Sequence, residues 1–256
     1  MDARRSITAG LTATLMLACS GSTGPAGTGR LTFQIANGTS IAATPTFAVG
    51  PDVLTITKVQ VVARKIKLER AAGTCPADGT STGPEAGGSS GGEHHEAADH
   101  DCADIQLDPM LLEPPVDATA LTVFSIDLPE GSYSELKIQI HRPTQDASDA
   151  AFLVAHPDFH DISIKVAGTF NGAPFTFTTP ITAEEEIELP KPIDVVAGTP
   201  AALTLQVDLS SWFKAEGGSL VSPIQPTEQI RARIEQNIRR SFHAFKDHDH
   251  NGQPDN

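Results

Sequence analysis

The 256-residue sequence predicts a mainly β protein, an antiparallel β-sandwich followed by one C-terminal amphipathic helix. Segments in which apolar and polar residues alternate recur along most of the chain, and such alternation marks a half-buried strand. Glycine and proline, 21 and 19 residues, supply the turns between these segments. No strand–helix–strand rhythm appears, which disfavours a parallel sheet. Short antiparallel strands in two layers are therefore expected.

Residues 1–18 have the features of an export signal. Arg4 and Arg5 form a positive start, and the apolar run that ends at Ala18 is too short to span a bilayer. Residues 15–20, which include the end of this run and Cys19, have the sequence LMLACS, and this resembles the lipobox of bacterial lipoproteins. The resemblance implies lipid attachment at Cys19 and an N-terminal membrane anchor. It also implies a place in the cell envelope, as an outer-membrane lipoprotein that is periplasmic or surface-facing.

Residues 19–29 are rich in Gly, Ser and Thr, which predicts a flexible tether. The β-sandwich is predicted over residues 30–213. Its first strand places Leu31, Phe33 and Ile35 on one face. In the next long segment, DVLTITKVQVVARKIKLER, the apolar residues change parity twice. Two β-bulges, or a bend between sheets, are therefore expected there.

The same alternation continues towards the end of the predicted sandwich. Further strands are predicted at residues 103–107, 121–127, 134–140, 162–170, 174–179, 185–190, 192–196 and 201–209. Asn171-Gly172 separates two alternating segments, and this dipeptide is a strong signal for a two-residue hairpin turn.

Residues 71–101, rich in Gly, Ser, acidic residues and His, interrupt the strands and predict a disordered insert. Once Cys19 carries lipid, Cys75 and Cys102 remain as an even pair in an oxidising compartment, so a disulfide is predicted between them. That bond would close a loop of 26 intervening residues and stabilise the fold by roughly 3–4 kcal/mol.

The insert carries His94, His95 and His100 among acidic residues. Imidazole together with carboxylate suits zinc, copper or nickel. The surrounding sequence lacks the fixed ligand spacing that holds a tetrahedral site. Two interpretations therefore stand side by side: weak capture of a transition metal, and a hydrophilic insert without a site.

Residues 214–226 are predicted to be a linker and residues 227–246 an amphipathic helix. The apolar residues of the latter are spaced by four or three positions, as one helical stripe requires: Ile230, Ile234, Ile238, Phe242 and Phe245. Thr227 stands where an N-cap is expected. The stripe is expected to pack onto the sandwich.

Residues 247–256 form an acidic tail whose pattern, D-x-D-x-N-G-x-x-D, spaces oxygen ligands as a calcium loop does. The predicted ligands are Asp247, Asp249, Asn251, Gln253 through its carbonyl, and Asp255, with Gly252 at the sharp turn. The pattern is similar to the calcium-binding repeats of thrombospondin type 3, and to an EF-hand loop without its closing Glu. Calcium is the predicted cofactor, and the loop supplies about half of a complete calcium site. A solvated chain end and another metal remain as alternatives.

The segment LPEGSYSELKI resembles the strand start of prealbumin-like sandwiches, in which the Gly turns the chain and the Tyr ring is buried. Residues 31–213 also resemble the bacterial lipoprotein domain of unknown function numbered forty-three eighty-two. This second likeness rests on VQVVARKIKLER, on the LPEGSY turn and on Trp212-Phe213. Both imply a prealbumin- or immunoglobulin-like sandwich, and neither implies an activity.

Composition narrows the possible functions. The net charge of −14 disfavours nucleic acid as a partner, because phosphates would be repelled. No nucleophile elbow or phosphate-binding glycine loop occurs, so the chain is predicted not to be an enzyme. A non-catalytic binding or structural module, with an unknown protein or small-molecule ligand, is favoured. Metal capture through the His-rich insert and an unrecognised hydrolase are the alternatives.

Overall fold

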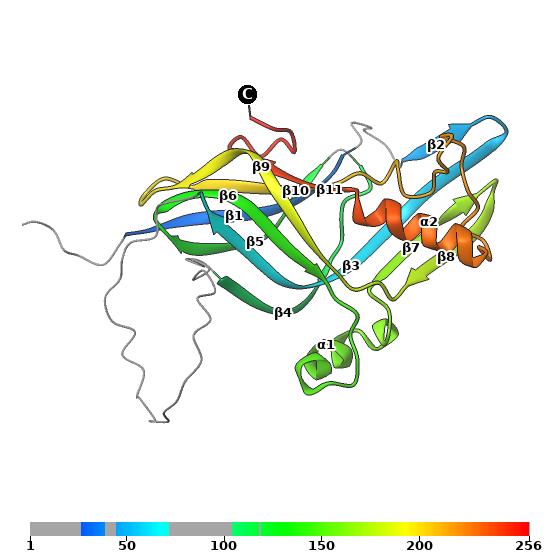
Figure 1. The fold of residues 1–256 in the computed structure, drawn as a ribbon, viewed down its shortest axis with the longest axis horizontal. Coiled ribbons are helices and arrows are strands. Elements are labelled where there is room, and N and C mark those ends of the chain that lie inside the picture. The colour runs from blue at the N-terminus through cyan, green and yellow to red at the C-terminus, as the bar shows by residue number, and fades with distance from the viewer. Residues whose placement is uncertain (1–26, 39–44, 72–103, 118, 256) are drawn as a thin grey trace, which may run out of the picture.

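The computed structural model describes residues 27–38, 45–71, 104–117 and 119–255. Within them the fold is mainly β, with two sheets packed together and few helices (Figure 1). The predicted β-sandwich is thus confirmed. No helix in this part of the chain is long and apolar enough to cross a membrane.

The smaller sheet has four strands in the order β11-β10-β1-β5. Their bounds are β1 Thr28–Asn37, β5 Ala120–Pro129, β10 Ala201–Val207 and β11 Phe242–Lys246. The β1–β10 pair is parallel, while the other two pairs are antiparallel. The sheet therefore departs at one place from the antiparallel pairing that the sequence predicts.

The larger sheet has seven strands, five of them in the order β8-β7-β3-β6-β9, with β2 and β4 also paired to β3. Their bounds are β2 Thr46–Val49, β3 Asp52–Arg70, β4 Asp104–Leu112, β6 Gly131–Ile140, β7 Ile164–Phe170, β8 Ala173–Thr179 and β9 Ala183–Val195. All pairs in this sheet are antiparallel.

Strand β3 is long enough to serve both halves of this sheet. Its first half pairs with β7 and its second half with β6. The register shifts between Ile56 and Lys58, and again between Ala63 and Lys65. These irregularities are the bulges that the changes in apolar parity predict.

Two further turns agree with the sequence analysis. Asn171 and Gly172 both adopt positive φ, +51° and +81°, and join β7 to β8 as a two-residue hairpin. Tyr133 is fully buried, and its hydroxyl donates to the Pro129 carbonyl over 2.8 Å. That bond fixes the turn between β5 and β6, and burial raises the pKa of the Tyr133 phenol.

The two segments predicted around Pro190 and Pro192 form one strand, β9. Its pairing with β6 shifts between Tyr133 and Glu135, and both prolines lie in the stretch of β9 without a partner in the register. A proline cannot donate to a strand ladder, so it is tolerated at such an irregularity on the last strand of a sheet.

The C-terminal region differs from the predicted helix over residues 227–246. Helix α2 spans only Glu228–Arg239, and Phe242 and Phe245 belong to strand β11. The N-cap is as predicted, since the Thr227 hydroxyl accepts from the amide of Ile230. A strand becomes possible because the chain turns at Ser241. The amide and hydroxyl of Ser241 both donate to the Ile238 carbonyl, and its hydroxyl oxygen accepts from the Trp212 indole.

The predicted stripe of α2 packs on the sandwich over its first three members. Ile234 and Ile238 are buried in the main core, and Ile230 packs against it. The side-chain NH2 of Asn237 shares its two hydrogens among three carbonyls of the turn after β10, those of Ser211, Trp212 and Lys214. The helix is thus fixed by apolar burial together with these polar contacts.

Helix α1, Ala150–Ala155, lies between two 3₁₀ turns, η1 Ala147–Asp149 and η2 Pro157–Phe159, in the connection from β6 to β7. His141 Nε2 and Asp149 Oδ1, both buried, lie 2.8 Å apart, and the Thr144 amide donates to Asp149 Oδ2. Burial alone would raise the pKa of Asp149, but these two donors hold it below its ordinary value.

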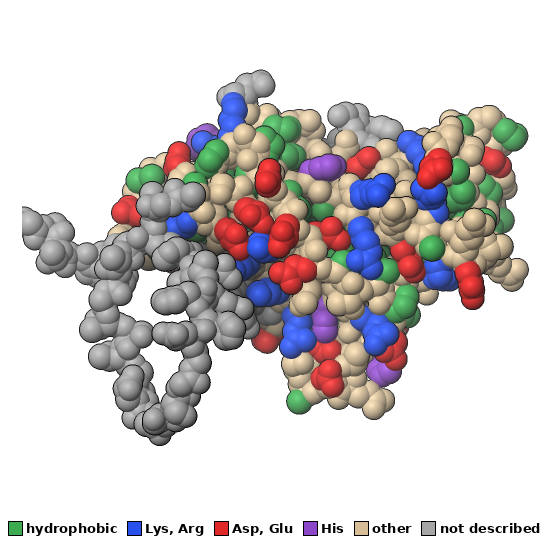
Figure 2. All heavy atoms as spheres, in the orientation of Figure 1, with side chains coloured by type: hydrophobic (Ala, Val, Ile, Leu, Met, Phe, Trp, Pro, Cys, Tyr) green, Lys and Arg blue, Asp and Glu red, His purple; other side chains and the backbone are tan. Residues whose placement is uncertain are grey.

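The outer face of the larger sheet is charged. Lys137 Nζ lies 2.9 Å from Glu186 Oε1 and 3.0 Å from Glu69 Oε1, and these bonds raise the pKa of Lys137. Figure 2 shows acidic side chains gathered around basic ones on this face. Because Glu69, Lys137 and Glu186 come from β3, β6 and β9, the charges support the register of three neighbouring strands.

Candidate metal centre

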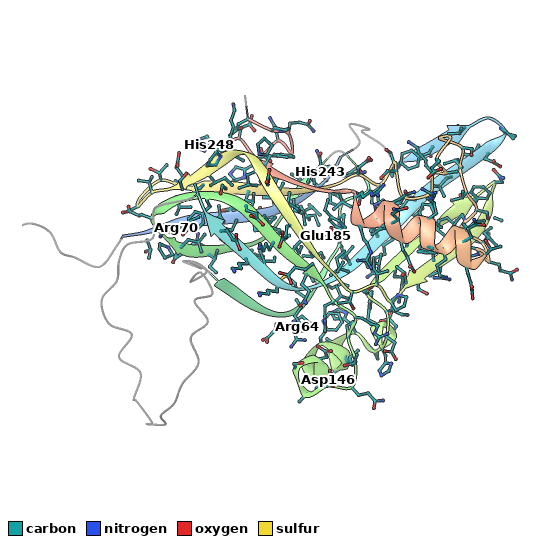
Figure 3. The ribbon with its side chains drawn as sticks, in the orientation of Figure 1. Arg64, Arg70, Asp146, Glu185, His243 and His248 are labelled. Atoms are coloured by element: carbon teal, nitrogen blue, oxygen red, sulfur yellow. The ribbon has the colours of Figure 1, made fainter. Side chains whose placement is uncertain are left out.

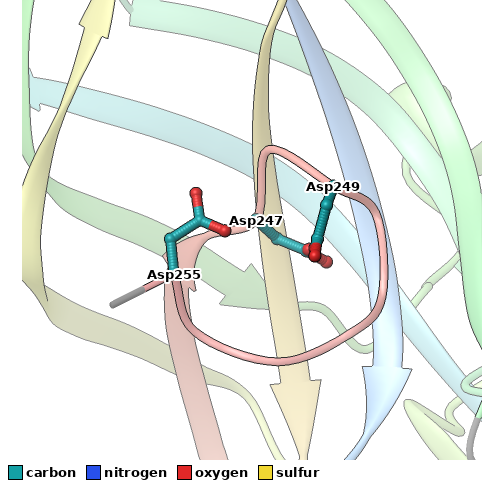
Figure 4. Close-up of side chains that lie close together, drawn as sticks. All are labelled: Asp247, Asp249 and Asp255. Atoms are coloured by element: carbon teal, nitrogen blue, oxygen red, sulfur yellow. The ribbon is translucent and has the colours of Figure 1, made fainter.

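The acidic residues 247–255 follow β11 directly and fold back over the smaller sheet as a loop (Figure 4). The Asp255 amide donates to the Lys246 carbonyl, which closes the loop at its base. Gly252 is buried with φ of +75°, and a Cβ there would lie 3.4 Å from Ala36 and Ala120 on the sheet. The segment is thus packed against β1 and β5 and is not a free tail.

Three carboxylates come together in this loop. Asp247, Asp249 and Asp255 each offer one oxygen, and these oxygens lie within 4.8 Å of one another. Figure 4 shows the carboxylates of Asp247 and Asp249 converging, with Asp255 beside Asp247. Asp247 is fully buried, Asp255 half-buried and Asp249 exposed. The group could hold a metal ion.

Asp247 is the best-anchored member. The Thr204 hydroxyl and the Gly252 amide donate to its Oδ2 over 2.8 and 2.9 Å, and the Asn251 amide donates to its Oδ1 over 3.0 Å. Its own amide donates to the Ala202 carbonyl of β10. Donors from the loop and from the smaller sheet thus fix the position of the Asp247 carboxylate.

The other predicted ligands occupy the exposed side of the loop. The Asn251 side chain donates to Asp249 Oδ2 over 2.7 Å, while its Oδ1 accepts from the Gln253 amide. Asp255 Oδ2 accepts from the backbone amide of His248. His248 is labelled in Figure 3, at the edge of the molecule. The structure therefore brings the three predicted carboxylates together and bonds the Asn251 side chain to one of them, Asp249.

Two residues that the sequence analysis did not select position this loop. Gln34 on β1 and Thr204 on β10 alternate with core residues, so the pattern places them on the solvent side, yet both are buried. Thr204 holds Asp247, and Gln34 Oε1 lies 3.0 Å from His250 Nδ1. A Gln oxygen can only accept, so His250 donates. No local signal in the sequence marks either residue.

The remaining predicted site residues lie outside the described part of the chain. They are the lipidation site Cys19, the disulfide pair Cys75 and Cys102, and the alternative metal ligands His94, His95 and His100. The signal peptide at residues 1–18 and almost all of the insert lie there too. Of the predicted tether, Thr28 and Gly29 are already part of β1.

Another titratable group of note lies where the two sheets meet. Strand β9 contacts β11 across the sandwich, and Figure 3 labels one residue of each, Glu185 and His243. Burial raises the pKa of Glu185, and the charge of Arg239 opposes that rise. No second group of three metal-ligating side chains occurs among residues 27–38, 45–71, 104–117 and 119–255.

Comparison with known proteins adds no relative: no family model, no curated protein and no solved structure matches the chain.

Proposed function

We propose that this protein is a lipid-anchored β-sandwich of the cell envelope, a non-catalytic binding or structural module whose C-terminal loop is ordered by calcium. The observation that carries the calcium assignment is the convergence of Asp247, Asp249 and Asp255 within 4.8 Å. Three like charges at that separation repel one another, and a divalent cation between them removes the repulsion.

Calcium is favoured over other cations by the donor set. Calcium takes six to eight oxygen ligands in flexible geometry, and the loop offers carboxylate and amide oxygens in the spacing D-x-D-x-N-G. Zinc and copper favour nitrogen and sulfur ligands. Magnesium demands near-ideal octahedral geometry, which a loop with one buried and two more accessible carboxylates does not impose.

Bound calcium would fasten the end of the chain to the smaller sheet. Asp247 is tied to β10 through Thr204, and His250 to β1 through Gln34. An ion shared by Asp247, Asp249 and Asp255 would join the exposed part of the loop to this buried part. Water must complete the coordination, so we expect a dissociation constant on the order of 10⁻⁴–10⁻³ M.

The calcium assignment is tested by calorimetry on the soluble domain without residues 1–19. One weak calcium event is expected, lost in Asp249→Ala/Asp255→Ala. The matched control, Glu184→Ala/Glu188→Ala, removes the same charge from exposed positions of β9 and should bind as the parent does. Binding that survives in the loop variant, or none in the parent at millimolar calcium, contradicts the assignment.

The anchor is supported by the short apolar run before Cys19. In a bacterial host, Cys19→Ser is expected to abolish labelling by a fatty-acid analogue and to release the protein from membranes. Cys75→Ser/Cys102→Ser is the control, since it also changes cysteines but leaves the proposed lipid site. Membrane association that persists without Cys19 would refute the anchor.

A further inference from the structure

Three Asn-Gly pairs occur among the described residues, and this dipeptide has a chemistry of its own. The amide nitrogen of the glycine can attack the side-chain carbonyl carbon of the asparagine and close a five-membered succinimide ring. Glycine favours this step because no Cβ hinders the close approach. The pairs are Asn37-Gly38, Asn171-Gly172 and Asn251-Gly252. The fold gives each pair different surroundings.

In two of the pairs, another part of the sandwich holds the asparagine side chain. Asn37 is 3% exposed, and its side chain donates to the Val116 carbonyl. Asn171 is exposed, but its side chain accepts from the Val53 amide and donates to Asp52, both on β3. In the part of the chain that the structure describes, no carboxylate accepts from the glycine amide of either pair.

The third pair lies in the acidic loop 247–255, and the bonds of its asparagine side chain are all local. Asn251 is exposed, and its Oδ1 accepts from the Gln253 amide over 2.7 Å. Its Nδ2 donates to Asp249 Oδ2, also over 2.7 Å. The Gly252 amide donates to Asp247 Oδ2 over 2.9 Å. This pair therefore combines an exposed asparagine with a carboxylate on the glycine amide.

These contacts match the groups that succinimide formation requires. A general base must lie within hydrogen-bond reach of the proton that it removes, and Asp247 lies so towards the Gly252 amide. The oxygen of Asn251 becomes negative when its Cγ is attacked, and a donor already aimed at that oxygen, the Gln253 amide, stabilises the charge. The reacting groups are neighbours in the chain, so no second molecule has to be positioned.

We propose that the loop modifies itself at Asn251, with Asp247 as the general base. The Gly252 nitrogen bonds to Asn251 Cγ, the Cγ–Nδ2 bond breaks, and the proton taken up by Asp247 leaves with the ammonia. Water then opens the ring. Opening at Cγ gives aspartate, and opening at the main-chain carbonyl gives isoaspartate. Overall one water is consumed and one ammonia is released, and no oxidant or reductant takes part.

Both products change the loop. Aspartate at position 251 gives the spacing D-x-D-x-D-G and adds a carboxylate beside the three that already converge. Isoaspartate adds a methylene to the main chain before Gly252, whose close packing on Ala36 and Ala120 leaves no room for a longer chain. The modification is thus a slow, one-way alteration of the loop, and it proceeds without calcium.

The test follows the purified protein during incubation at mildly alkaline pH. EDTA is present throughout, so a failure of the calcium assignment does not affect the result. Trypsin cleaves after Lys246, and residues 247–256 then form a peptide that contains neither of the other two pairs. Fragment mass spectrometry locates the amide-to-acid conversion at residue 251. The free synthetic peptide 247–256 is the comparison, since it has the same sequence but no sheet to position Asp247.

We expect Asn251 to convert about tenfold or more faster in the folded protein than in the free peptide, which corresponds to about 1.4 kcal/mol at the transition state. Asn37 and Asn171 should convert more slowly than Asn251. Asp247→Asn keeps an acceptor oxygen but cannot take the proton, so its rate should fall to that of the peptide. Glu184→Gln, which removes a charge from exposed β9, should convert at the parent rate.

Conversion of Asn251 that is no faster in the folded protein than in the peptide overturns the proposal, and this comparison needs no variant. An unchanged rate in a folded Asp247→Asn protein overturns the base, and circular dichroism establishes that this variant is folded. Faster conversion at Asn37 or Asn171 overturns the choice of site. Calcium binding by the loop is measured separately and is independent of each of these outcomes.

Discussion

The two margins of the smaller sheet are closed in opposite ways. At the β11 margin, strand β9 contacts the sheet. Between the margins, loop 247–255 covers the outward-facing Gln34 and Thr204 on the central strands β1 and β10. At the β5 margin, the inward-facing Leu121, opposite Ile35 in the β1–β5 register, remains 47% exposed. Polar residues expected in solvent are buried beneath the loop, and an apolar residue expected in the core is exposed at the β5 margin.

The difference shows that two properties of a strand residue are set separately: the side of the sheet on which its side chain lies, and how deeply that side chain is buried. A period of two determines the side of the sheet on which a residue lies. Depth depends on what the rest of the chain places over that position. Thr204 is buried because the loop at residues 247–255 covers it. Leu121 is exposed because, in the part of the chain that the structure describes, no strand pairs beyond β5.

The largest expected effect is at the base of the β5 margin. Ile35→Ala removes a buried core side chain and should lower the free energy of unfolding by about 2–5 kcal/mol, since a cavity remains where the chain cannot collapse. Urea denaturation measures this. A loss under about 1 kcal/mol would mean that the core beside the β5 margin is loosely packed, and that the two margins differ less than described.

The next effect concerns the segment that carries α1. Asp149→Asn replaces an oxygen that accepts from His141 or Thr144 with an amino group, so a buried donor loses its acceptor. We expect a loss of about 1.5–3 kcal/mol near neutral pH. Guanidinium denaturation of the variant beside Asp146→Asn, an exposed control on the same loop, measures it.

The same carboxylate gives the pH dependence its sign. The folded-state pKa of Asp149 lies below its ordinary value of 3.8, so its contribution is fully present above that value and is lost as pH falls through the folded pKa. The Asn variant should show a flatter dependence of stability in this acid range. Parallel curves for parent and variant would contradict the role of the pair.

A smaller effect is expected beneath the covering loop. Thr204→Val keeps the shape of the side chain but removes the hydroxyl donor to Asp247. Since Asp247 retains the Asn251 and Gly252 amides, we expect a loss of about 1 kcal/mol, together with weaker calcium binding. Thr32→Val, which removes the exposed hydroxyl pair between Thr32 of β1 and Ser125 of β5, is the control. Equal calcium affinity in both variants would show that Thr204 does not contribute to calcium binding by the loop.

The smallest effect is predicted at the β5 margin itself. Leu121→Ala should cost about 1 kcal/mol or less, because about half of the side chain already meets water. The ratio of this loss to that of Ile35→Ala, residues paired in the register, measures the asymmetry directly. A loss as large as that of Ile35→Ala would show that Leu121 is covered in solution.

Much of the site could be predicted from local pattern, and the rest could not. The ligand spacing at Asp247, Asp249 and Asp255 is a property of consecutive residues, so it is visible without a fold. The contribution of Gln34 and Thr204 depends on contacts between distant segments: Gln34 is 216 positions from His250, and Thr204 is 43 positions from Asp247. The alternation of apolar and polar residues along a strand carries no information about which distant segment will contact that strand.

The sequence by itself determined the β architecture, the bulges of β3, the Asn171-Gly172 hairpin and the spacing of the acidic ligands, because each follows from backbone preference over a few residues. Only the tertiary structure decided that Phe242 and Phe245 form a strand. Their spacing suits a helical stripe, but pairing with β10 satisfies the backbone of an otherwise open sheet edge. That pairing also delivers Asp247 to Thr204, so the position of the candidate metal centre depends on the fold.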